Sequence, residues 1–312
     1  MPDLKECKIV FLGTPVFSVA VLDKLVQEGC NVVGVVTAPD KPAGRGMQLS
    51  QSPVKKYAVE KGLHLLQPEK LKDPVFINEL KSLQADVQVV VAFRMLPEIV
   101  WNMPPLGTIN LHASLLPNYR GAAPINWAII NGEKETGITT FKLQHQIDTG
   151  DILLKEKISI GENETAGSLH DRMMHQGADL VYKTLVGYCN GSIQPQPQGE
   201  GLKEAPLQTA PKIHTSTGEI NWQQNAKQVH DLIRGLSPYP GAFTKLKDKM
   251  LKVYASTYLV DTHSTPFGEM DSDGKTFMRF STPDGWVYIH ELQLEGKKRM
   301  DVTSFLKGYR FN

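Results

Sequence analysis

Short apolar runs alternate with longer segments in which apolar positions recur every three or four residues. The runs at 8–12, 31–37 and 86–93 are apolar almost throughout, which is typical of strands buried on both faces of a sheet. Between the first two runs, residues 13–29 contain a glycine turn followed by helical spacing. A strand, a turn, a helix and a second strand form a βαβ unit, so the chain is predicted to begin with a doubly wound, Rossmann-like α/β domain.

The turn after the first predicted strand reads Gly13-Thr14-Pro15. It lacks the G-x-G-x-x-G spacing that lets a backbone approach a dinucleotide pyrophosphate. The sequence therefore excludes a nicotinamide-linked oxidoreductase. Further along, helical spacing and one more buried run predict helices at 53–61, 74–83 and 165–188 and a central strand at 107–112.

The last third of the chain has a different pattern. Residues 191–208 are rich in proline, glycine and glutamine and have little to bury, so they are predicted to connect two domains. Short strands are predicted near 242–247, 250–260, 275–281 and 285–294. Their spacing favours a small β-barrel. The expected division is a domain at 1–190, a connection at 191–208 and a second domain at 209–312.

Residues 38–53 form a loop that is too long for a routine connection. With three prolines, two glycines and the cations Lys41 and Arg45, the loop is predicted to contain no regular element. Long loops of this kind are often functional, so this segment is a candidate for substrate contact.

Composition and charge narrow the candidate functions. The chain has 34 basic and 33 acidic side chains, a net charge of +1, so no global polycation indicates nucleic-acid binding. Residues 1–210 carry a net charge of −2 and the remainder carries +3. Three cysteines without C-x-x-C spacing argue against a disulfide framework or a zinc ribbon and favour a reducing compartment. No H-E-x-x-H spacing, signal peptide or membrane-length apolar stretch is present, so we expect no metal and a soluble, cytoplasmic protein.

The candidate chemistry lies in residues 107–151. Asn110 and His112 are two apart on a predicted strand, so their side chains point to the same side. Asp148 follows in a polar D-T-G-D turn from which a carboxylate could fold back towards the imidazole. An amide, an imidazole and a carboxylate supply an oxyanion donor, a proton shuttle and an anion that holds the imidazole in one tautomer. This combination indicates an acyl-transfer site.

The segment that follows His112 resembles a known family. Asn-x-His, the run Ser114-Leu115-Leu116-Pro117 and the later Asp-Thr-Gly resemble the catalytic core of the folate-dependent formyltransferases. The resemblance implies that Asn110, His112 and Asp148 are catalytic and that 10-formyltetrahydrofolate is the formyl donor. It also implies a folate pocket lined by Phe93, Met95, Leu96, Ser114, Leu115, Leu116 and Pro117. Near that pocket the chain departs from the family pattern, because Arg94 stands in a stretch that usually bears glycine.

Two further resemblances indicate the acceptor. The loop at 38–53 is similar to the substrate-gripping loop of the family members that formylate methionyl-tRNA, and the tail is similar to their oligonucleotide-fold-like (OB-fold) barrel domain. They imply transfer of the formyl group to the α-amino group of methionyl initiator tRNA, and we expect a monomer. The expected tRNA contacts are Lys41, Arg45, Arg120, Lys245, Lys247 and Lys249.

Two points remain open from the sequence. The last three lysines alternate and are expected to share one face of a strand, where they either track phosphates or protect a sheet edge. The acceptor could instead be a small amine, such as an amino-sugar nucleotide or a glycinamide ribonucleotide. A formyl-folate hydrolase and a non-catalytic RNA-binding module are the remaining alternatives.

Overall fold

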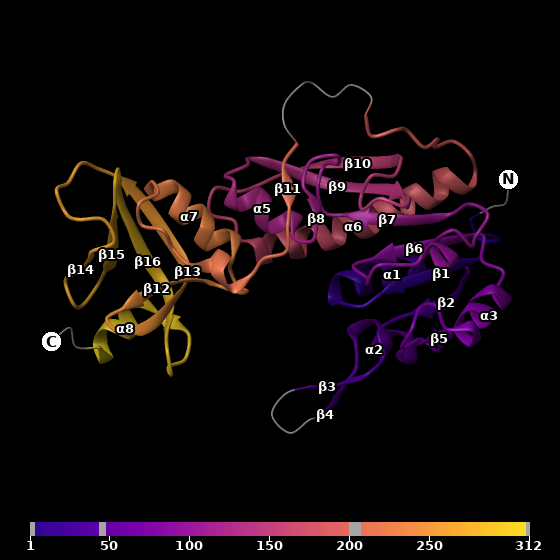
Figure 1. Ribbon diagram of the computed structural model, residues 1–312, viewed down its shortest axis with the longest axis horizontal. Coiled ribbons are helices and arrows are strands. Elements are labelled where there is room, and N and C mark those ends of the chain that lie inside the picture. The colour runs from indigo at the N-terminus through magenta and orange to yellow at the C-terminus, as the bar shows by residue number, and fades with distance from the viewer. Residues whose placement is uncertain (1–3, 44–47, 200–206, 310–312) are drawn as a thin grey trace. The chain divides into compact units, whose positions relative to one another are not determined.

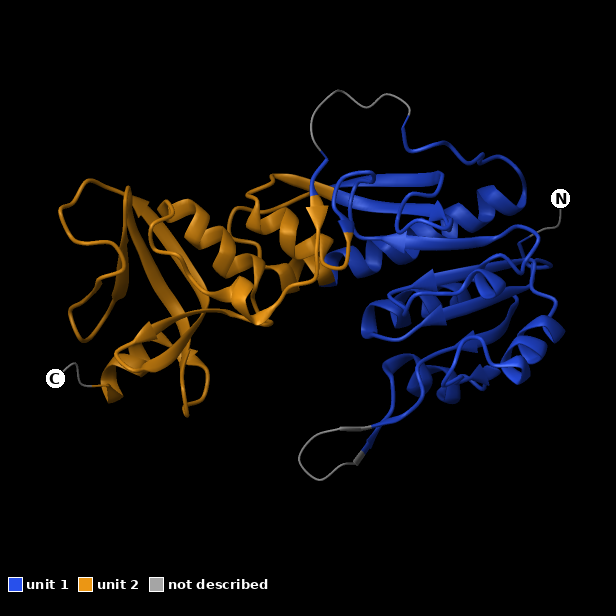
Figure 2. Cartoon of the chain, in the orientation of Figure 1, with its two compact units in different colours: residues 1–120, 137–158, 171–208 blue, residues 121–136, 159–170, 209–312 orange. Residues whose placement is uncertain are grey.

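The chain folds into two compact units that interleave along the sequence. The computed structural model describes residues 4–43, 48–199 and 207–309, except for the side chains of residues 42, 43 and 48. Figure 1 shows the elements and Figure 2 the units. Unit 1 comprises residues 1–120, 137–158 and 171–208, and unit 2 comprises residues 121–136, 159–170 and 209–312. The division predicted from the sequence, with domains at 1–190 and 209–312, stays a prediction.

Unit 1 is built on a seven-stranded sheet (Figure 1). In sheet order its strands are β10 (Ile152–Ser159), β9 (Glu135–Lys142), β7 (Thr108–His112), β6 (Val87–Val91), β1 (Ile9–Gly13), β2 (Val32–Val36) and β5 (Leu65–Leu66). The strands from β7 to β5 are parallel to one another, and β9 runs antiparallel to β7. The predicted doubly wound, Rossmann-like fold is confirmed.

Burial explains why the central strands read as continuous apolar runs. Every residue of β1 and β6 is buried, as expected for parallel strands covered on both faces. One core of unit 1 contains residues of these strands, of β2 and β5, and of two helices, α3 (Pro74–Ser82) and α4 (Glu98–Trp101). Its members include Val10, Leu12, Val36, Leu66, Phe76, Leu80 and Val90.

Two helices of unit 1, α2 (Pro53–Glu60) and α3 (Pro74–Ser82), begin at a polar capping residue. Ser52 accepts a hydrogen bond from the Lys55 backbone N–H at 3.0 Å, and Asp73 accepts one from the Val75 N–H at 2.9 Å, each before a proline at the first helical turn. Along the chain, the helices up to residue 189 are α1 (Val16–Gln27), α2 (Pro53–Glu60), α3 (Pro74–Ser82), α4 (Glu98–Trp101), α5 (Pro124–Ile130) and α6 (Ala166–Cys189). Of these, α5 belongs to unit 2, and α6 has residues of both units. In the part of the chain that the structure describes, no helix is long and apolar enough to cross a membrane.

The prediction that residues 38–53 contain no regular element is wrong. The segment includes two short antiparallel strands, β3 (Lys41–Ala43) and β4 (Gln48–Ser50), which pair Lys41 with Ser50 and Ala43 with Gln48. A two-stranded ribbon has two edges, and a proline is tolerated where its missing N–H faces away from the partner strand. The loop is therefore a hairpin at its base (Figure 1).

Unit 2 contains a curled antiparallel sheet. Its strands, in sheet order, are β12 (Ala242–Leu246), β13 (Lys249–Val260), β16 (Gly285–Leu294), β15 (Met278–Thr282) and β14 (Met270–Ser272), and β17 (Met300–Asp301) pairs with β16. The remaining short elements are β8 (Arg120–Gly121), β11 (Thr209–Ala210), a 3₁₀ turn η1 (Thr215–Gly218) and α8 (Val302–Gly308). The predicted barrel-like C-terminal fold is confirmed.

One helix of unit 2 closes the hydrophobic side of this sheet. α7 (Ala226–Gly235) begins with a reciprocal cap between Asn225 and Gln228. Buried residues of α7 and of the sheet share one core, which includes Val229, Ile233, Leu251, Val253, Phe280, Val287 and Ile289.

The expectation that Lys245, Lys247 and Lys249 share one face of a strand is wrong. Lys245 lies in β12 and Lys249 in β13, while Lys247 lies in the turn between them with φ 54°. The ladder pairs Leu246 with Lys249, so Lys249 lies on the face of Leu246 and Lys245 lies on the opposite face. The chain reverses at this hairpin, and the three lysines form no single row.

Candidate active site

β7 places Asn110 and His112 at the carboxyl edge of the parallel strands of unit 1. The strand lies between β6 and β9, with Asn110 beside Val90 on one side and Phe141 on the other. Alternate residues of a strand face the same side, so the amide and the imidazole project together. Ligands of open α/β sheets bind beyond this edge.

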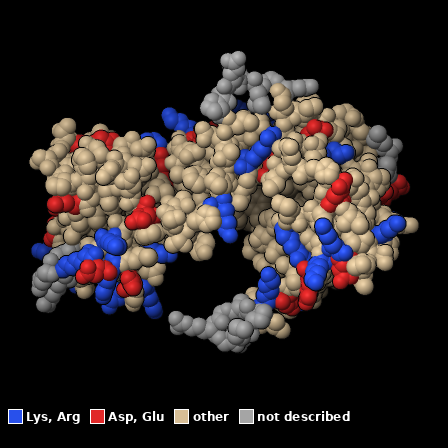
Figure 3. Space-filling view, in the orientation of Figure 1, with Lys and Arg blue, Asp and Glu red and all other residues tan. Residues whose placement is uncertain are grey.

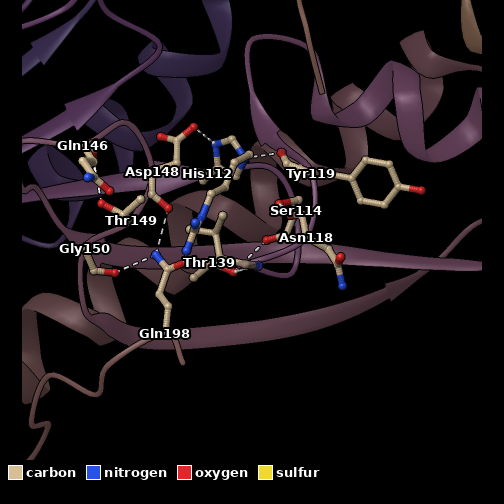
Figure 4. A network of polar contacts seen from close by, with 12 residues as sticks. His112, Ser114, Asn118, Tyr119, Thr139, Gln146, Asp148, Thr149, Gly150 and Gln198 are labelled. Atoms are coloured by element: carbon tan, nitrogen blue, oxygen red, sulfur yellow. Dashed lines mark hydrogen bonds and ion pairs between the residues drawn. The ribbon is translucent and has the colours of Figure 1, made fainter. Parts of the chain in front are cut away.

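The His112 ring is held from both sides (Figure 4). Its Nε2 lies 2.8 Å from the Tyr119 carbonyl oxygen, and its Nδ1 lies 3.8 Å from Asp148 Oδ2. A carbonyl oxygen only accepts, so Nε2 carries a hydrogen and Nδ1 faces the carboxylate. The ring is 7% exposed and the Asp148 side chain 11% exposed, so water screens this pair weakly.

This geometry divides the roles differently from the sequence expectation. Asp148 was expected to hold the imidazole in one tautomer, but the carbonyl of Tyr119 does so. The 3.8 Å separation from Asp148 is longer than a hydrogen bond and within the range of an ion pair. Asp148 is therefore placed to stabilise a proton that arrives on Nδ1.

The turn that carries Asp148 is tightly built. Asp148 has φ 53°, a left-handed conformation that is uncommon for a residue with a side chain. A Cβ atom added to Gly150 would lie 1.6 Å from the Lys142 carbonyl oxygen, so only glycine fits there. The turn consequently packs directly on the end of β9.

Gln198 is part of the site, and the sequence did not reveal it. Its Nε2 donates to the carbonyl oxygens of Asp148 at 2.9 Å and Gly150 at 2.6 Å, and its Oε1 accepts from Arg120 Nε at 3.2 Å and Nη2 at 2.6 Å. The side chain is buried, and Figure 4 shows it below the Asp148 turn. Nothing in the glutamine-rich run separates this residue from its exposed neighbours, so composition alone indicated a connection.

The loop after β7 is fastened by its own polar groups. Ser114 Oγ donates to the Asn118 carbonyl oxygen at 2.6 Å, and Thr139 Oγ1 donates to the Ser114 carbonyl oxygen at 2.7 Å. The Asn118 side-chain oxygen accepts from the Gln208 backbone N–H at 3.2 Å. These bonds hold the Tyr119 carbonyl where His112 meets it.

Most predicted folate contacts in this loop are buried. Ser114, Leu116 and Pro117 have buried side chains, and Leu115 is half-buried. Leu115 packs over Gly137, where an added Cβ would lie 2.4 Å from its Cδ2. A folate role for these residues stays a prediction, and their burial favours contact through the backbone and Leu115.

The turn after β6 brings the other predicted folate contacts together. Met95 is 76% exposed, Phe93 is half-buried and Leu96 is buried. The Arg94 guanidinium donates to the carbonyl oxygens of Glu69 and Pro68. The arginine that departs from the family pattern therefore ties this turn to the segment after β5.

A cavity of about 640 Å³ lies in unit 1 at the carboxyl ends of β1, β2 and β6. Its lining includes Thr14, Ala38, Asp40, Lys41, Ala92 and Arg94. Ala92 directly follows β6, the strand that pairs with β7 through Val90 and Asn110. The Lys55 ammonium, 2.6 Å from Asp40, holds the pKa of that carboxyl below its usual value. The charged side chains in its lining suit a polar ligand, and Asn110, His112 and Asp148 are not among the lining residues.

The predicted tRNA contacts are distributed over both units. Lys41 is exposed beside the cavity, Arg120 is engaged by Gln198, and Arg45 lies outside the described residues. Lys245, Lys247 and Lys249 are exposed. On the face seen in Figure 3, described basic side chains lie among acidic ones and form no unbroken cationic strip.

Within the described ranges, no three His, Cys, Asp or Glu side chains are grouped so that they could hold a metal ion.

Comparison with known proteins defines the class. Residues 7–185 match the family described as formyl transferase, and residues 212–310 match the formyl transferase C-terminal domain. The chain belongs to the formyl transferase family, and the formyltransferase assignment made from the sequence is confirmed.

Relatives that are about half identical to this chain are methionyl-tRNA formyltransferases. The chain is 54% identical to a methionyl-tRNA formyltransferase of Phocaeicola vulgatus, covering 98% of this chain and 97% of the relative. It is 49% identical to a methionyl-tRNA formyltransferase of Bacteroides thetaiotaomicron, covering 99% and 97%.

Solved structures share the fold at low identity. A sugar 3N-formyl transferase, WlaRD, superposes with TM-score 0.67 at 18% identity, covering 94% of this chain and 99% of that protein. HypX from Aquifex aeolicus, in complex with tetrahydrofolic acid, superposes with TM-score 0.64 at 19% identity, covering 96% of this chain and 47% of HypX.

Proposed function

We propose that the protein transfers a formyl group from 10-formyltetrahydrofolate to the α-amino group of methionyl initiator tRNA. The observation that carries this proposal is the convergence of Asn110, His112 and Asp148 at the carboxyl edge of the sheet, in a chain about half identical to methionyl-tRNA formyltransferases along its length. The donor is supported by the fold neighbours, since one was solved with tetrahydrofolic acid and another with 5-N-formyl-THF.

His112 moves the proton in this reaction. As the amine nitrogen attacks the formyl carbon, Nδ1 accepts the amine proton, while the Tyr119 carbonyl keeps the hydrogen on Nε2. Asp148 then faces the resulting imidazolium from 3.8 Å. A free α-amine titrates near 7.7–8, so about a tenth of it is already neutral at pH 7 and a strong base is unnecessary. The same imidazolium can return the proton to the departing folate nitrogen.

Asn110 stabilises the developing oxyanion. It is half-buried, and within the described residues its side chain has no hydrogen-bond partner, so its N–H donors are available to substrate. The loss of one such donor costs on the order of 3 kcal/mol in the barrier, which is roughly a hundredfold in rate.

Substrate binding is proposed for the residues around this centre. Phe93 and Met95 on the β6 turn and Leu115 offer exposed or half-exposed apolar surface to the folate, together with the backbone near Leu96, Ser114, Leu116 and Pro117. The proposed tRNA contacts are Lys41 on β3, Arg45, Arg120, Lys245, Lys247 and Lys249. We further propose a monomer acting in the cytoplasm, where the charged tRNA is made.

Three substitutions test the mechanism. In purified protein, Asn110→Ala, His112→Ala and Asp148→Ala should each lower kcat for formylation of methionyl-tRNA by about a hundredfold or more while both KM values stay nearly unchanged. His175→Ala, at an exposed position of α6, is the matched control and should keep full activity. A near-normal rate in any of the three removes that residue from the mechanism.

A further inference from the structure

We propose that Gln198 is a positioning residue for this reaction: its side-chain amide holds the Asp148 turn at its working distance from His112. The inference rests on the proposed function, since it assigns a role within the same site. Gln198 lies in the segment after α6, far from the other members of the site along the chain. It does not contact the reacting atoms and acts through Asp148.

The polar contacts form a closed ring. His112 Nε2 meets the Tyr119 carbonyl oxygen, and the next residue, Arg120, donates to Gln198 Oε1. Gln198 Nε2 donates to the Asp148 carbonyl oxygen, and Asp148 Oδ2 faces His112 Nδ1. A displacement of any member changes the distance between the imidazole and the carboxylate. Figure 4 shows Gln198 on the opposite side of the Asp148 turn from His112.

The chemistry of the ring requires a primary amide at this position. One end of the side chain must accept from a guanidinium, and the other must donate to two carbonyl oxygens, those of Asp148 and Gly150. A glutamate would keep the contact with Arg120 but present an oxygen to both carbonyls. A methionine has a similar length and makes neither set of hydrogen bonds.

The Asp148 turn needs this external support. Asp148 has φ 53°, in the left-handed region, where a residue with a side chain pays a free-energy cost that its surroundings offset. The contact is also buried, since Gln198 is only 7% exposed, and an unpaired buried carbonyl is costly. Without the amide, the turn is expected to relax towards a less strained backbone and to carry the carboxylate away from Nδ1.

The backbone beside Gln198 supplies a matched control. Gln196 exchanges backbone hydrogen bonds with Ile152 at 2.8 and 2.9 Å, which anchors the segment, but its own side chain is exposed. Gln196→Met and Gln196→Glu therefore make the same chemical changes two residues away, without touching the ring.

Steady-state kinetics of the full chain with methionyl-tRNA and 10-formyltetrahydrofolate test the proposal. Gln198→Met and Gln198→Glu should lower kcat by about 10- to 100-fold, with both KM values within about twofold of wild type, and the Gln196 variants should match wild type. Melting temperatures monitor folding. Wild-type rates in a folded Gln198→Met protein would overturn the assignment.

A double-mutant cycle separates positioning from a general structural role. If Gln198 acts only through Asp148, adding Gln198→Met to Asp148→Ala should cost less than about twofold more in kcat. An equal loss in both backgrounds would contradict the assignment. Failure of the wild-type protein to formylate methionyl-tRNA would instead contradict the proposed function, so the two outcomes are distinct.

Discussion

Gly150→Ala is expected to displace the catalytic turn without adding or removing a functional group. An added Cβ would lie 1.6 Å from the Lys142 carbonyl oxygen, whereas ordinary contact begins near 3.4 Å. The obstacle is backbone at the end of β9, which cannot swing aside as a flexible side chain would. The turn must therefore move by about 1.8 Å.

The size of the effect follows from the separation between His112 and Asp148. At an effective dielectric constant of about 20, a unit charge pair interacts by about 4.4 kcal/mol at 3.8 Å and by about 3.0 kcal/mol at about 5.6 Å. The difference of about 1.4 kcal/mol destabilises the protonated imidazole that forms during transfer. It corresponds to roughly a tenfold loss in kcat.

The assay is steady-state formylation of methionyl-tRNA by Gly150→Ala and by Gly199→Ala. An added Cβ at Gly199 meets no described atom within 4 Å, so this variant should have wild-type kinetics. Gly150→Ala should lose about tenfold in kcat with nearly unchanged KM. A folded Gly150→Ala protein with the wild-type kcat would refute the reasoning, because the turn would then be free to move without consequence.

Three further outcomes are expected. Arg94→Ala removes the hydrogen-bond donors that hold the turn after β6. The KM for the folate donor should rise roughly fivefold, which corresponds to about 1 kcal/mol of binding free energy, while kcat is preserved. An unchanged KM would show that other contacts hold the turn. Lys55 lowers the pKa of Asp40, so their pairing stabilises the fold above the ordinary carboxyl pKa of about 3.9, and this stabilisation is lost as the pH falls through the lowered pKa. Asp40→Asn should therefore have a lower Tm than wild type at pH 7 and the same Tm in acid. A difference in Tm that does not change with pH would contradict the pairing. Lys245→Ala and Lys249→Ala should each lower the slope of tRNA affinity against salt by about one unit, because each lysine is proposed to contact the tRNA; an unchanged slope for either variant would remove that lysine from the proposed contacts.

The local parts of the site could be predicted because they depend on short-range periodicity. Asn110 and His112 are two residues apart on a buried strand, and the two-residue period of a strand places them together whatever the rest of the fold does. The D-T-G-D turn was visible from its composition. The βαβ order likewise implied the parallel sheet and its functional edge.

The remaining parts depend on contacts that no local pattern encodes. Gln198 is distant along the chain from His112 and lies in a run whose other glutamines are exposed, so only the folded chain distinguishes it. The imidazole tautomer is fixed by the backbone carbonyl of Tyr119. Every residue has such a carbonyl, so the sequence does not indicate which one contacts His112. The turn at Lys247 lacks glycine and proline, so the alternating lysines suggested one shared strand face, although separate strands were predicted near 242–247 and 250–260.

The central claim is that this site formylates the amine of methionyl initiator tRNA. Its most direct test supplies purified protein with formyl-labelled 10-formyltetrahydrofolate and a mixture of methionyl initiator tRNA, elongator methionyl-tRNA and an amino-sugar nucleotide. We expect the label to pass to the initiator methionyl-tRNA and His112→Ala to abolish the transfer. Label found on the sugar nucleotide alone, or released only as formate, would contradict it.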